Sequence, residues 1–371
     1  MVHELSSVDI SHLVKELKLS LEQAKVDRIY HPQKEEVLIQ FHIPGKGRRI
    51  LRILLPIVMY LTDFKGNMPD KPSGFCMYLR KHLESCRLQS LRQVGFERIV
   101  EFVLEKRDAV YKVYVEFIPP GNVIICKDDK IVSPLYLKIW KDRSIRPGVK
   151  YEWPSREHNA FDAAPVTIRG LLGEKELVKV LAIDLGMGGR YAEEVCTRAG
   201  IDKKSTDLSN EEIDRIIIAI KAVFDAKQPS VIYKDGKPDD VVPFKLAIND
   251  GLESKEFGSF NEALDSVFTD KEISSAEDEH VSASRTKIGK TELILKEQEK
   301  RLHELEESVE TNRRAGELIF ENYLLVQEIL EQITKARKEI GWKEIKKKLK
   351  GHALIKQVNE KESKITIVLG D

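Results

Sequence analysis

A long heptad repeat restricts the fold of this 371-residue chain more than any other feature. Apolar residues recur at heptad spacing from residue 288 onward, interrupted by the polar Thr291, Gln298 and Asn312. The a positions are Ile288, Leu295, Leu302, Val309, Gly316, Tyr323 and Leu330, and the d positions include Leu305, Ile319, Val326, Ile333 and Ile340. Such a seam needs a partner helix. We predict one arm of a coiled coil over residues 288–350. Because no second comparable helix is present, a homodimer through this seam is one open interpretation.

The N-terminal part of the chain is patterned for strands. β-rich runs cover residues 37–43, 50–55, 99–104, 111–117 and 122–126. Pro44, Gly45 and Gly47 between the first two runs indicate a hairpin. Two amphipathic helices accompany the strands, one capped by Ser7 and one that begins near Pro72. We predict an α+β domain around an antiparallel sheet over residues 1–160.

A helical pattern with a glycine-rich turn follows. Residues 174–184 and 190–199 favour helices on either side of the sequence LGMGG, and Ser209 with Glu212 forms a capping box for a third helix. This order is typical of a helix-hairpin-helix module, predicted over residues 161–228. The residues predicted to bind an anion such as phosphate are Gly186, Gly188, Gly189 and Arg190, because glycine lets backbone amides approach closely. The alternative is an ordinary tight turn.

The remaining boundaries follow from composition. We predict a β-hairpin and a helix returning to the first domain over residues 229–269, and a polar, acidic linker over 270–287. Residues 351–371 would begin the middle segment of the coiled coil. They contain one strand, 365–369, with no partner nearby, which suggests that the sequence is cut from a longer one.

Charge excludes a uniformly basic protein. Lys plus Arg and Asp plus Glu each number 61, so any contact with nucleic acid must be local. One cluster of cations is predicted to contact RNA backbone and consists of Arg80, Lys81, Arg87, Arg92 and Arg98. A second predicted cluster lies at the end of the coil and includes Lys343, Lys346, Lys347 and Lys348. A solvated helix face is the alternative reading of both clusters.

The sequence contains no motif for a cofactor or for a membrane span. The four cysteines, Cys76, Cys86, Cys126 and Cys196, have neither zinc-site spacing nor a disulfide pattern. No phosphate-binding loop of the G-x-x-x-x-G-K-[ST] type occurs. We find no signal peptide and no apolar run that would span a bilayer. We therefore expect a cytoplasmic protein with no metal, no cofactor and no membrane partner.

Six segments, in order along nearly the whole chain, resemble one family. They are PSGFCMYLRKHL at 72–83, GFERIV at 95–100, RSIRPGVKYEWP at 143–154, LGMGGRYAEEVCTRAGI at 185–201, SFNEALDSVF at 259–268 and RAGELIFENYLLVQEIL at 314–330. Together they are similar to the NFACT proteins, the family of RqcH and NEMF, also called fibronectin-binding protein A. The resemblance, to archaeal members in particular, implies an N-terminal domain like that of formamidopyrimidine-DNA glycosylases, then the helix-hairpin-helix and the coil. It also implies a returning helix and a C-terminal RNA-binding domain that this sequence lacks.

The resemblance implies a function in ribosome-associated quality control. Family members bind a large ribosomal subunit that still holds peptidyl-tRNA and recruit tRNA for template-free extension of the stalled chain, with alanine in prokaryotes. The ribosome makes the peptide bond, so no catalytic residue is implied. The implied partners are the large subunit, its ribosomal RNA and tRNA, and the implied location is the ribosome in the cytoplasm.

The resemblance also implies three residues that handle tRNA. The matching positions are Asp9, Glu97 and Arg98, where Glu97 replaces the family's usual aspartate and is longer by one methylene. A guanidinium contacts phosphate or a base edge in bidentate fashion, and a neighbouring carboxylate orients it. Alternatively, Glu97 and Arg98 form a surface pair and Asp9 is a first-turn carboxylate favoured by the helix dipole.

Two other functions stay open at this point. A glycosylase-like protein that binds nucleic acid fits the architecture, but the start Met1-Val2-His3-Glu4 lacks the N-terminal proline nucleophile of those enzymes, so no strand cleavage is expected. A surface fibronectin-binding adhesin fits the old family name. The missing signal peptide argues against an adhesin.

Overall fold

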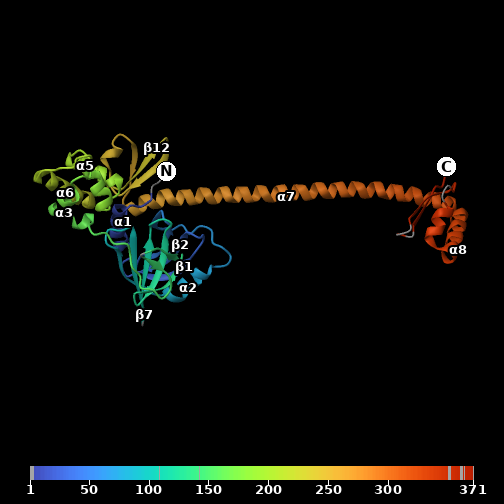
Figure 1. The fold of residues 1–371 in the computed structure, drawn as a ribbon, viewed down its shortest axis with the longest axis horizontal. Coiled ribbons are helices and arrows are strands. Elements are labelled where there is room, and N and C mark those ends of the chain that lie inside the picture. Colours follow the sequence, from blue (N-terminus) through green and yellow to red (C-terminus); the bar gives the residue numbers. More distant parts are fainter. Residues whose placement is uncertain are drawn as a thin grey trace. The chain divides into compact units, whose positions relative to one another are not determined.

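The computed structural model describes residues 4–107, 109–141, 143–349, 352–359, 362 and 364–370, and only the backbone of residues 275–294. The described chain divides into two compact units (Figure 1), of which the first ends at Glu279 and the second begins at His280. Each unit has its own buried core. The finer domain boundaries expected from the sequence stay predictions. The glycosylase argument from Met1, Val2 and His3 lies outside the described residues.

A nine-stranded antiparallel sheet forms the first part of the first unit. Its strand order is β4-β3-β2-β1-β5-β6-β7-β8-β9. The strands are β1 (Lys25–Tyr30), β2 (Glu36–Ile43), β3 (Gly47–Leu54), β4 (Val58–Thr62), β5 (Arg87–Gln93), β6 (Ile99–Lys106), β7 (Ala109–Glu116), β8 (Asn122–Lys127) and β9 (Lys130–Pro134). Ile43 pairs with Gly47 across the predicted hairpin. The α+β prediction is therefore confirmed, although β1, β4, β5 and β9 carried no clear signal in the sequence.

Smaller elements complete this part. The helix α2 (Gly74–Leu83) buries Cys76, Leu79 and Leu83, and its N-cap is Ser73. Two-residue strands β10 (Lys138–Ile139) and β11 (Ser144–Ile145) form a hairpin after β9. A short 3-10 helix covers Ala160–Asp162.

The helix α1 (Ser7–Ser20) lies between two cores because its two faces are both apolar. Leu13 and Leu17 are buried in the core of the large sheet, whereas Val8 is buried in the core of the helices that follow. Figure 1 shows the strands on one side of α1 and the helices α3, α5 and α6 on the other. The N-cap is Ser6, whose side chain closes a capping box with Asp9, and not Ser7 as predicted.

The helical part contains α3 (Pro165–Leu171), α4 (Leu177–Lys179), a π-helical turn (Val180–Asp184), α5 (Gly189–Ala199) and α6 (Asn210–Asp225). The Ser209–Glu212 capping box is present as predicted. The helix predicted over 174–184 begins only at Leu177 and widens into the π-helical turn. α5 begins directly after the glycine-rich turn and ends at Gly200, which adopts the left-handed conformation.

A three-stranded sheet then leads to a long helix. Its strands are β12 (Ser230–Lys234), β13 (Lys237–Val242) and β14 (Glu253–Glu256), and a 3-10 turn covers Ala247–Asn249. The helix α7 (Phe260–Glu321) begins where Glu16 of α1 accepts hydrogen bonds from the backbone amides of Phe260 and Asn261, both at 2.8 Å. The linker predicted over residues 270–287 is wrong, because the backbone there is helical and continuous with α7.

The second unit has a small core of its own. The helix α8 (Tyr323–Lys348) is followed by β15 (Ile355–Asn359) and β16 (Lys364–Ile367), which pair antiparallel. Ile333, Ile355 and Val358 form the buried cluster. The prediction that the last strand has no partner is therefore wrong. Gly341 interrupts α8 with φ of 71°, so the basic segment after it is not continuous with the coil.

The predicted heptad seam runs along two successive helices, the end of α7 and the start of α8. Among the residues that the structure describes, Leu302, Leu305 and Val309 are exposed on α7, although they are apolar. Ile288 and Thr291 lie outside the residues whose side chains are described. The helical state of the seam is confirmed, whereas its pairing in a coiled coil stays a prediction.

Candidate functional site

Asp9 is the centre of a buried polar network where α1 meets the helical part. Its Oδ2 accepts hydrogen bonds from the backbone amide and the hydroxyl of Ser6, at 2.8 and 2.7 Å. Asp9 is 1% exposed. A carboxylate at this depth must be neutralised by partners, since an unpaired buried charge is costly.

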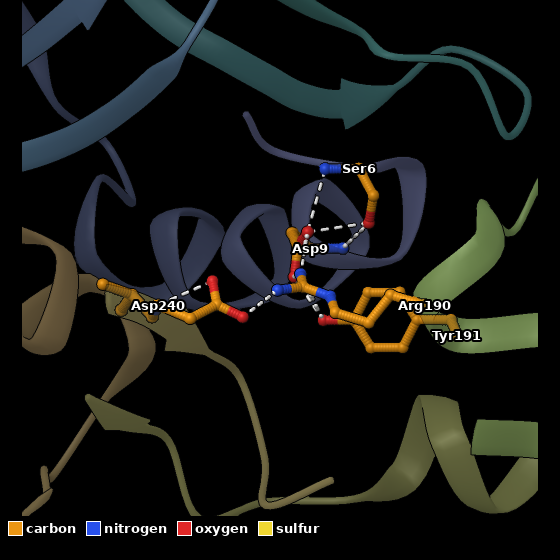
Figure 2. A network of polar contacts seen from close by, with 6 residues as sticks. Ser6, Asp9, Arg190, Tyr191 and Asp240 are labelled. Atoms are coloured by element: carbon orange, nitrogen blue, oxygen red, sulfur yellow. Dashed lines mark hydrogen bonds and ion pairs between the residues drawn. The ribbon is translucent and has the colours of Figure 1, made fainter. Parts of the chain in front are cut away.

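Arg190 supplies the neutralising charge (Figure 2). Its Nη2 donates to Asp9 Oδ2 at 2.9 Å, and its Nη1 donates to Asp240 of β13. The guanidinium therefore joins three segments that are distant in the sequence: α1, the start of α5 and the hairpin of β12 and β13. Only 20% of the Arg190 side chain is exposed.

Tyr191 completes the network. Its hydroxyl donates to Asp9 Oδ1, and its ring lies beneath the Arg190 guanidinium, 4.8 Å from ring centroid to Cζ. Burial, together with the neighbouring Asp9, raises the pKa of Tyr191 well above its ordinary value, so the hydroxyl stays a donor. Burial alone would lower the pKa of Arg190, but Asp9, Tyr191 and Asp240 raise it, so the guanidinium stays charged.

A second ion pair connects Glu97 to the glycine-rich turn. Glu97 is buried in the turn between β5 and β6, and its Oε1 lies 2.8 Å from Nε of Arg156. Arg156 also donates from Nη1 to the carbonyl of Ile183, at 2.7 Å. A Cβ on Gly186 would lie 2.8 Å from Arg156 Nε, so the glycine leaves the space that this arginine occupies. We call Ser6, Asp9, Glu97, Arg156, Gly186, Arg190, Tyr191 and Asp240 the junction.

Some backbone amides of the glycine-rich turn already donate hydrogen bonds within the protein. The amides of Met187 and Gly188 donate to the carbonyls of Leu181 and Ala182, each at 3.1 Å. Gly188 has φ of 80°, which favours glycine, and no side chain caps α5. Gly189, the first residue of α5, is exposed. Anion binding by this turn stays a prediction, but Arg190 faces the carboxylates of the junction and is not a free anion ligand.

Arg98 lies beside the junction and keeps part of its side chain exposed. Its Nη2 donates to Glu4 at 2.7 Å and to the carbonyl of Pro56 at 3.4 Å. Its Nε is buried without a hydrogen-bond partner among the described residues. Of the three residues that the resemblance implies, Asp9 and Glu97 are buried, and only Arg98 is partly accessible to a ligand.

The other predicted cations are spread over the first unit. Arg80 donates from Nε to the carbonyl of Ile29, at 2.7 Å, near the end of β1. β1 and β5 pair at Lys25 and Arg87 and run in opposite directions from there. At about 3.3 Å per residue, Arg80 and Arg92 are separated by about 30 Å along the strands.

The structure therefore does not bring Arg80 together with Arg92. Arg92 forms an ion pair with Glu101, while Lys81 and Arg87 are exposed. Contact of the individual cations with RNA stays a prediction.

The basic segment expected at the end of the coil follows the interruption at Gly341. Lys343, Lys346, Lys347 and Lys348 are exposed in the last turns of α8. Lys347 lies 3.4 Å from Glu344. Lys350, counted in the same basic segment, lies outside the described residues.

A separate polar cavity of about 860 Å³ lies at the edge of the sheet. Arg52 in its wall is buried and lies 3.3 Å from Glu36 and 3.3 Å from Glu272 of α7. Its Nη2 donates to the carbonyls of Phe64 and Lys65. Burial raises the pKa of Glu36 to about 7, although Arg52 opposes the shift.

The contacts of the junction suit it to hold the surrounding helices, strands and turns in fixed positions. Each titratable side chain in it already has an intramolecular partner. Across the described side chains, no cluster of three or more His, Cys, Asp or Glu residues could hold a metal ion. In the same described part, no helix has the length and apolarity needed to cross a membrane.

Asp9, Glu97 and Arg190 were predicted from the sequence as site residues, but their hydrogen-bond and ion-pair partners were not. Asp240 and Arg156 lay in no distinguishing motif, and Tyr191 lay in the segment LGMGGRYAEEVCTRAGI but was not singled out there. The contacts join residues up to 182 positions apart in the chain, as for Tyr191 and Asp9, and such pairs carry no local signal.

Comparison with known proteins gives relatives along the whole chain. A family model described as NFACT N-terminal and middle domains matches residues 6–367. The archaeal Rqc2 homolog aRqcH of Methanocaldococcus jannaschii is 34% identical over 393 aligned residues, which cover 100% of this chain and 58% of that protein. The ribosome quality control complex subunit NEMF of Mus musculus is 24% identical, with 93% of this chain and 36% of that protein covered. The chain thus spans little more than half the length of its archaeal relative.

Solved structures agree on the fold. The N-terminal part of the fibronectin/fibrinogen-binding protein from Streptococcus suis superposes with a TM-score of 0.60 at 22% identity, over 72% of this chain and 100% of that one. The fibrinogen-binding protein from Staphylococcus aureus gives 0.59 at 20% identity, over 70% and 97%. Since the family model matches almost every residue and the archaeal relative aligns from end to end, this chain belongs to the NFACT family and is a homologue of the Rqc2, RqcH and NEMF proteins.

Proposed function

We propose that this protein is a ribosome-associated quality-control factor that binds obstructed large ribosomal subunits and recruits tRNA for template-free C-terminal tailing of stalled chains. The observation that carries the proposal is the alignment of the whole chain with an archaeal Rqc2 homologue. The protein does not itself form the peptide bond. Its partners are the large subunit with its ribosomal RNA and tRNA, and it acts in the cytoplasm.

The geometry of the first unit supports a positioning role. In the junction, charged side chains hold α1, the turn before β6, the glycine-rich turn and β13 to one another. A factor that positions an RNA needs such fixed relations between its surfaces more than it needs a reactive group. We propose that Asp9 and Glu97 act by fixing this arrangement and that Arg98, partly exposed beside it, contacts RNA.

The finer architecture belongs to the same proposal. The helices on either side of the glycine-rich turn would serve as a helix-hairpin-helix module, and the first domain would correspond to the N-terminal domain of formamidopyrimidine-DNA glycosylases. The exposed seam of α7 would pair as a coiled coil.

The test is recovery of stalled ribosomal complexes. A tagged form of the chain is expressed in cells that lack their own family member, and the bound RNA is sequenced after purification under mild salt. We expect large-subunit ribosomal RNA and tRNA in excess over small-subunit ribosomal RNA. Recovery of both subunits in equal amounts, or of neither, would contradict the proposal.

Arg98→Ala is compared with Arg28→Ala, which removes an exposed arginine of β1 outside the junction. We expect Arg98→Ala to lose tRNA while retaining large-subunit RNA. Labelled fibronectin and an oxidised-base DNA duplex, offered to the same protein, test the adhesin and glycosylase alternatives.

A further inference from the structure

We propose that the β10–β11 hairpin and the segment after it form a surface that binds unpaired RNA bases by stacking on Trp140 and Trp153. This inference rests on the proposed function, because it identifies where a recruited RNA is contacted. We call the residues Lys138, Trp140, Lys141, Arg143, Arg146, Lys150, Tyr151 and Trp153 the tryptophan surface.

Aromatic rings and a guanidinium lie in series on this surface. The Cζ of Arg143 lies 5.5 Å from the ring centroid of Trp140 and 5.4 Å from that of Tyr151. The rings of Tyr151 and Trp153 are 6.5 Å apart. Trp140 is 47% exposed and Trp153 is 41% exposed. Two indole rings are thus accessible at either end of one connected series.

Buried groups beneath the surface hold the series in place. Glu116 of β7 is buried and accepts hydrogen bonds from Arg143 and, at 2.7 Å, from the hydroxyl of Tyr151. Arg143 also donates from Nε to the carbonyl of Glu152, at 2.6 Å. Tyr151 in turn stacks on Tyr114, with ring centroids 3.9 Å apart. The exposed rings are therefore carried by a fixed support, which reduces the entropy lost when a ligand binds.

The charge around the rings is positive on an otherwise neutral chain. Between residues 137 and 153 the sequence has five Lys or Arg, at 138, 141, 143, 146 and 150, against the two acids Asp142 and Glu152. Lys141, Arg146 and Lys150 are exposed, and neither Lys141 nor Arg146 forms an ion pair with another residue that the structure describes. Exposed cations beside exposed indoles suit a polyanion whose bases can stack.

These features favour unpaired RNA over other occupants. Every base has a face that stacks on an aromatic ring, whereas the bases of a duplex are covered by their neighbours. Isolated tryptophans would also suit a protein partner, but the positive charge beside them favours a phosphate backbone. The occupant that we infer is a single-stranded RNA segment such as a loop or an end.

The test uses the tryptophans as their own reporters. The chain has three tryptophans, and Trp342→Phe removes the one in the second unit. An unpaired oligoribonucleotide of about 12 nucleotides, within the site sizes of single-strand binders, is titrated into this variant at low salt. We expect quenching of the remaining fluorescence with the RNA and little with a duplex of equal length.

Substitutions assign the effect to single rings. Trp140→Ala and Trp153→Ala are each expected to weaken oligoribonucleotide binding about 5- to 150-fold, the range for loss of one base–ring stack. Phe320→Ala, which removes an aromatic ring that is 83% exposed on α7, is the matched control and should leave binding unchanged. Lys141→Gln should reduce the log–log salt slope by about 0.7 if it contacts one phosphate.

The outcomes separate this inference from the proposed function. If the chain recovers large-subunit RNA and tRNA from cells but the tryptophan variants bind the oligoribonucleotide as the parent does, the tryptophan surface is not an RNA site and the proposed function stands. Absence of quenching also overturns the inference and would assign the surface to a protein partner. Quenching without recovery of ribosomal RNA would support the surface and contradict the proposed function.

Discussion

The junction and the arm, which we define as residues 295–321 of α7, use the same kinds of ion pair in opposite surroundings. At the junction, Asp9 and Arg190 are packed between α1, α5 and β13. On the arm, Arg313 and Glu317 lie 3.2 Å apart with 70% and 61% of their side chains exposed. Similar distances, 2.9 Å between Asp9 and Arg190 and 3.2 Å between Arg313 and Glu317, therefore do not mean similar energies. A buried carboxylate without its partner is strongly penalised, whereas an exposed one regains water.

The difference explains which charges organise the protein. The junction joins elements from distant parts of the sequence, so its pairs hold the first unit together. The arm's pairs connect residues one helical turn apart and add little to a helix that exists without them. Four predictions compare buried groups with exposed ones, in order of decreasing effect.

Asp9→Ala should have the largest effect. The substitution leaves the guanidinium of Arg190 and the hydroxyl of Tyr191 without the acceptor that both contact. We expect the free energy of unfolding to fall by about 3–5 kcal/mol, as for loss of one partner of a buried pair. Denaturation in urea measures it. Asp9→Asn keeps the shape and one acceptor oxygen, and should cost less. Equal stability of Asp9→Ala and the parent would refute the role of the junction.

Glu36 should make stability depend on pH. Burial raises the pKa of Glu36 in the folded protein to about 7, above its ordinary value of 4.5. Between these values the folded protein holds a proton that the unfolded chain has released. Stability contributed by this group is therefore highest below pH 4.5 and falls as pH rises toward 7, by about 3 kcal/mol in total.

The matched variant is Glu36→Gln, which cannot ionise. As pH rises from about 4.5 to about 7, the unfolding free energy of the parent should fall relative to that of this variant. A difference that is constant with pH would mean that Glu36 titrates normally.

Gly186→Ala should disturb the junction without removing a charge. Its Cβ would lie 2.8 Å from Arg156 Nε, and the residue has φ of +74°. We expect a loss of about 1–3 kcal/mol from strain and displacement of Arg156. Gly189→Ala, three residues later at the start of α5, meets no atom within 4 Å and should be neutral or slightly stabilising. Thermal unfolding of the two variants makes the comparison, and equal melting temperatures would contradict it.

Glu317→Ala on the arm should have the smallest effect. It removes the exposed pair with Arg313 while alanine favours the helix, so the change should stay within about 0.5 kcal/mol. The measurement is urea denaturation under the conditions used for Asp9→Ala. A loss comparable to that of Asp9→Ala would show that the arm's charges matter as much as those of the junction.

Much of the fold followed from local patterns in the sequence. The β2–β3 hairpin, the capping box of α6 and the helical heptads depend on neighbouring residues, so turn and cap chemistry predicted them. The acidic composition near residue 277 predicted a linker, but composition does not prevent a charged helix, and α7 is continuous there.

The site was less predictable for a physical reason. Asp9 and Arg190 were each found, one from the resemblance and one from the glycine-rich turn, but their contact spans 181 positions. The cations from Arg80 to Arg98 looked like one cluster in the sequence, yet β1 and β5 run in opposite directions from their shared pair and separate Arg80 from Arg92. Asp240 had no signal, since an acidic residue in a hairpin usually indicates an exposed turn.

We propose that the junction acts through structure, whereas the tryptophan surface and Arg98 act through contact with RNA. Two quantities are measured on the same preparations of Asp9→Asn and Trp153→Ala. The tRNA affinity is measured at low denaturant and at a temperature where both variants are folded. The unfolding free energy is measured by denaturation in urea. We expect Asp9→Asn to lose stability and keep its tRNA affinity, and Trp153→Ala to keep its stability and lose affinity. A folded Asp9→Asn variant of unchanged stability that no longer binds tRNA would contradict this proposal.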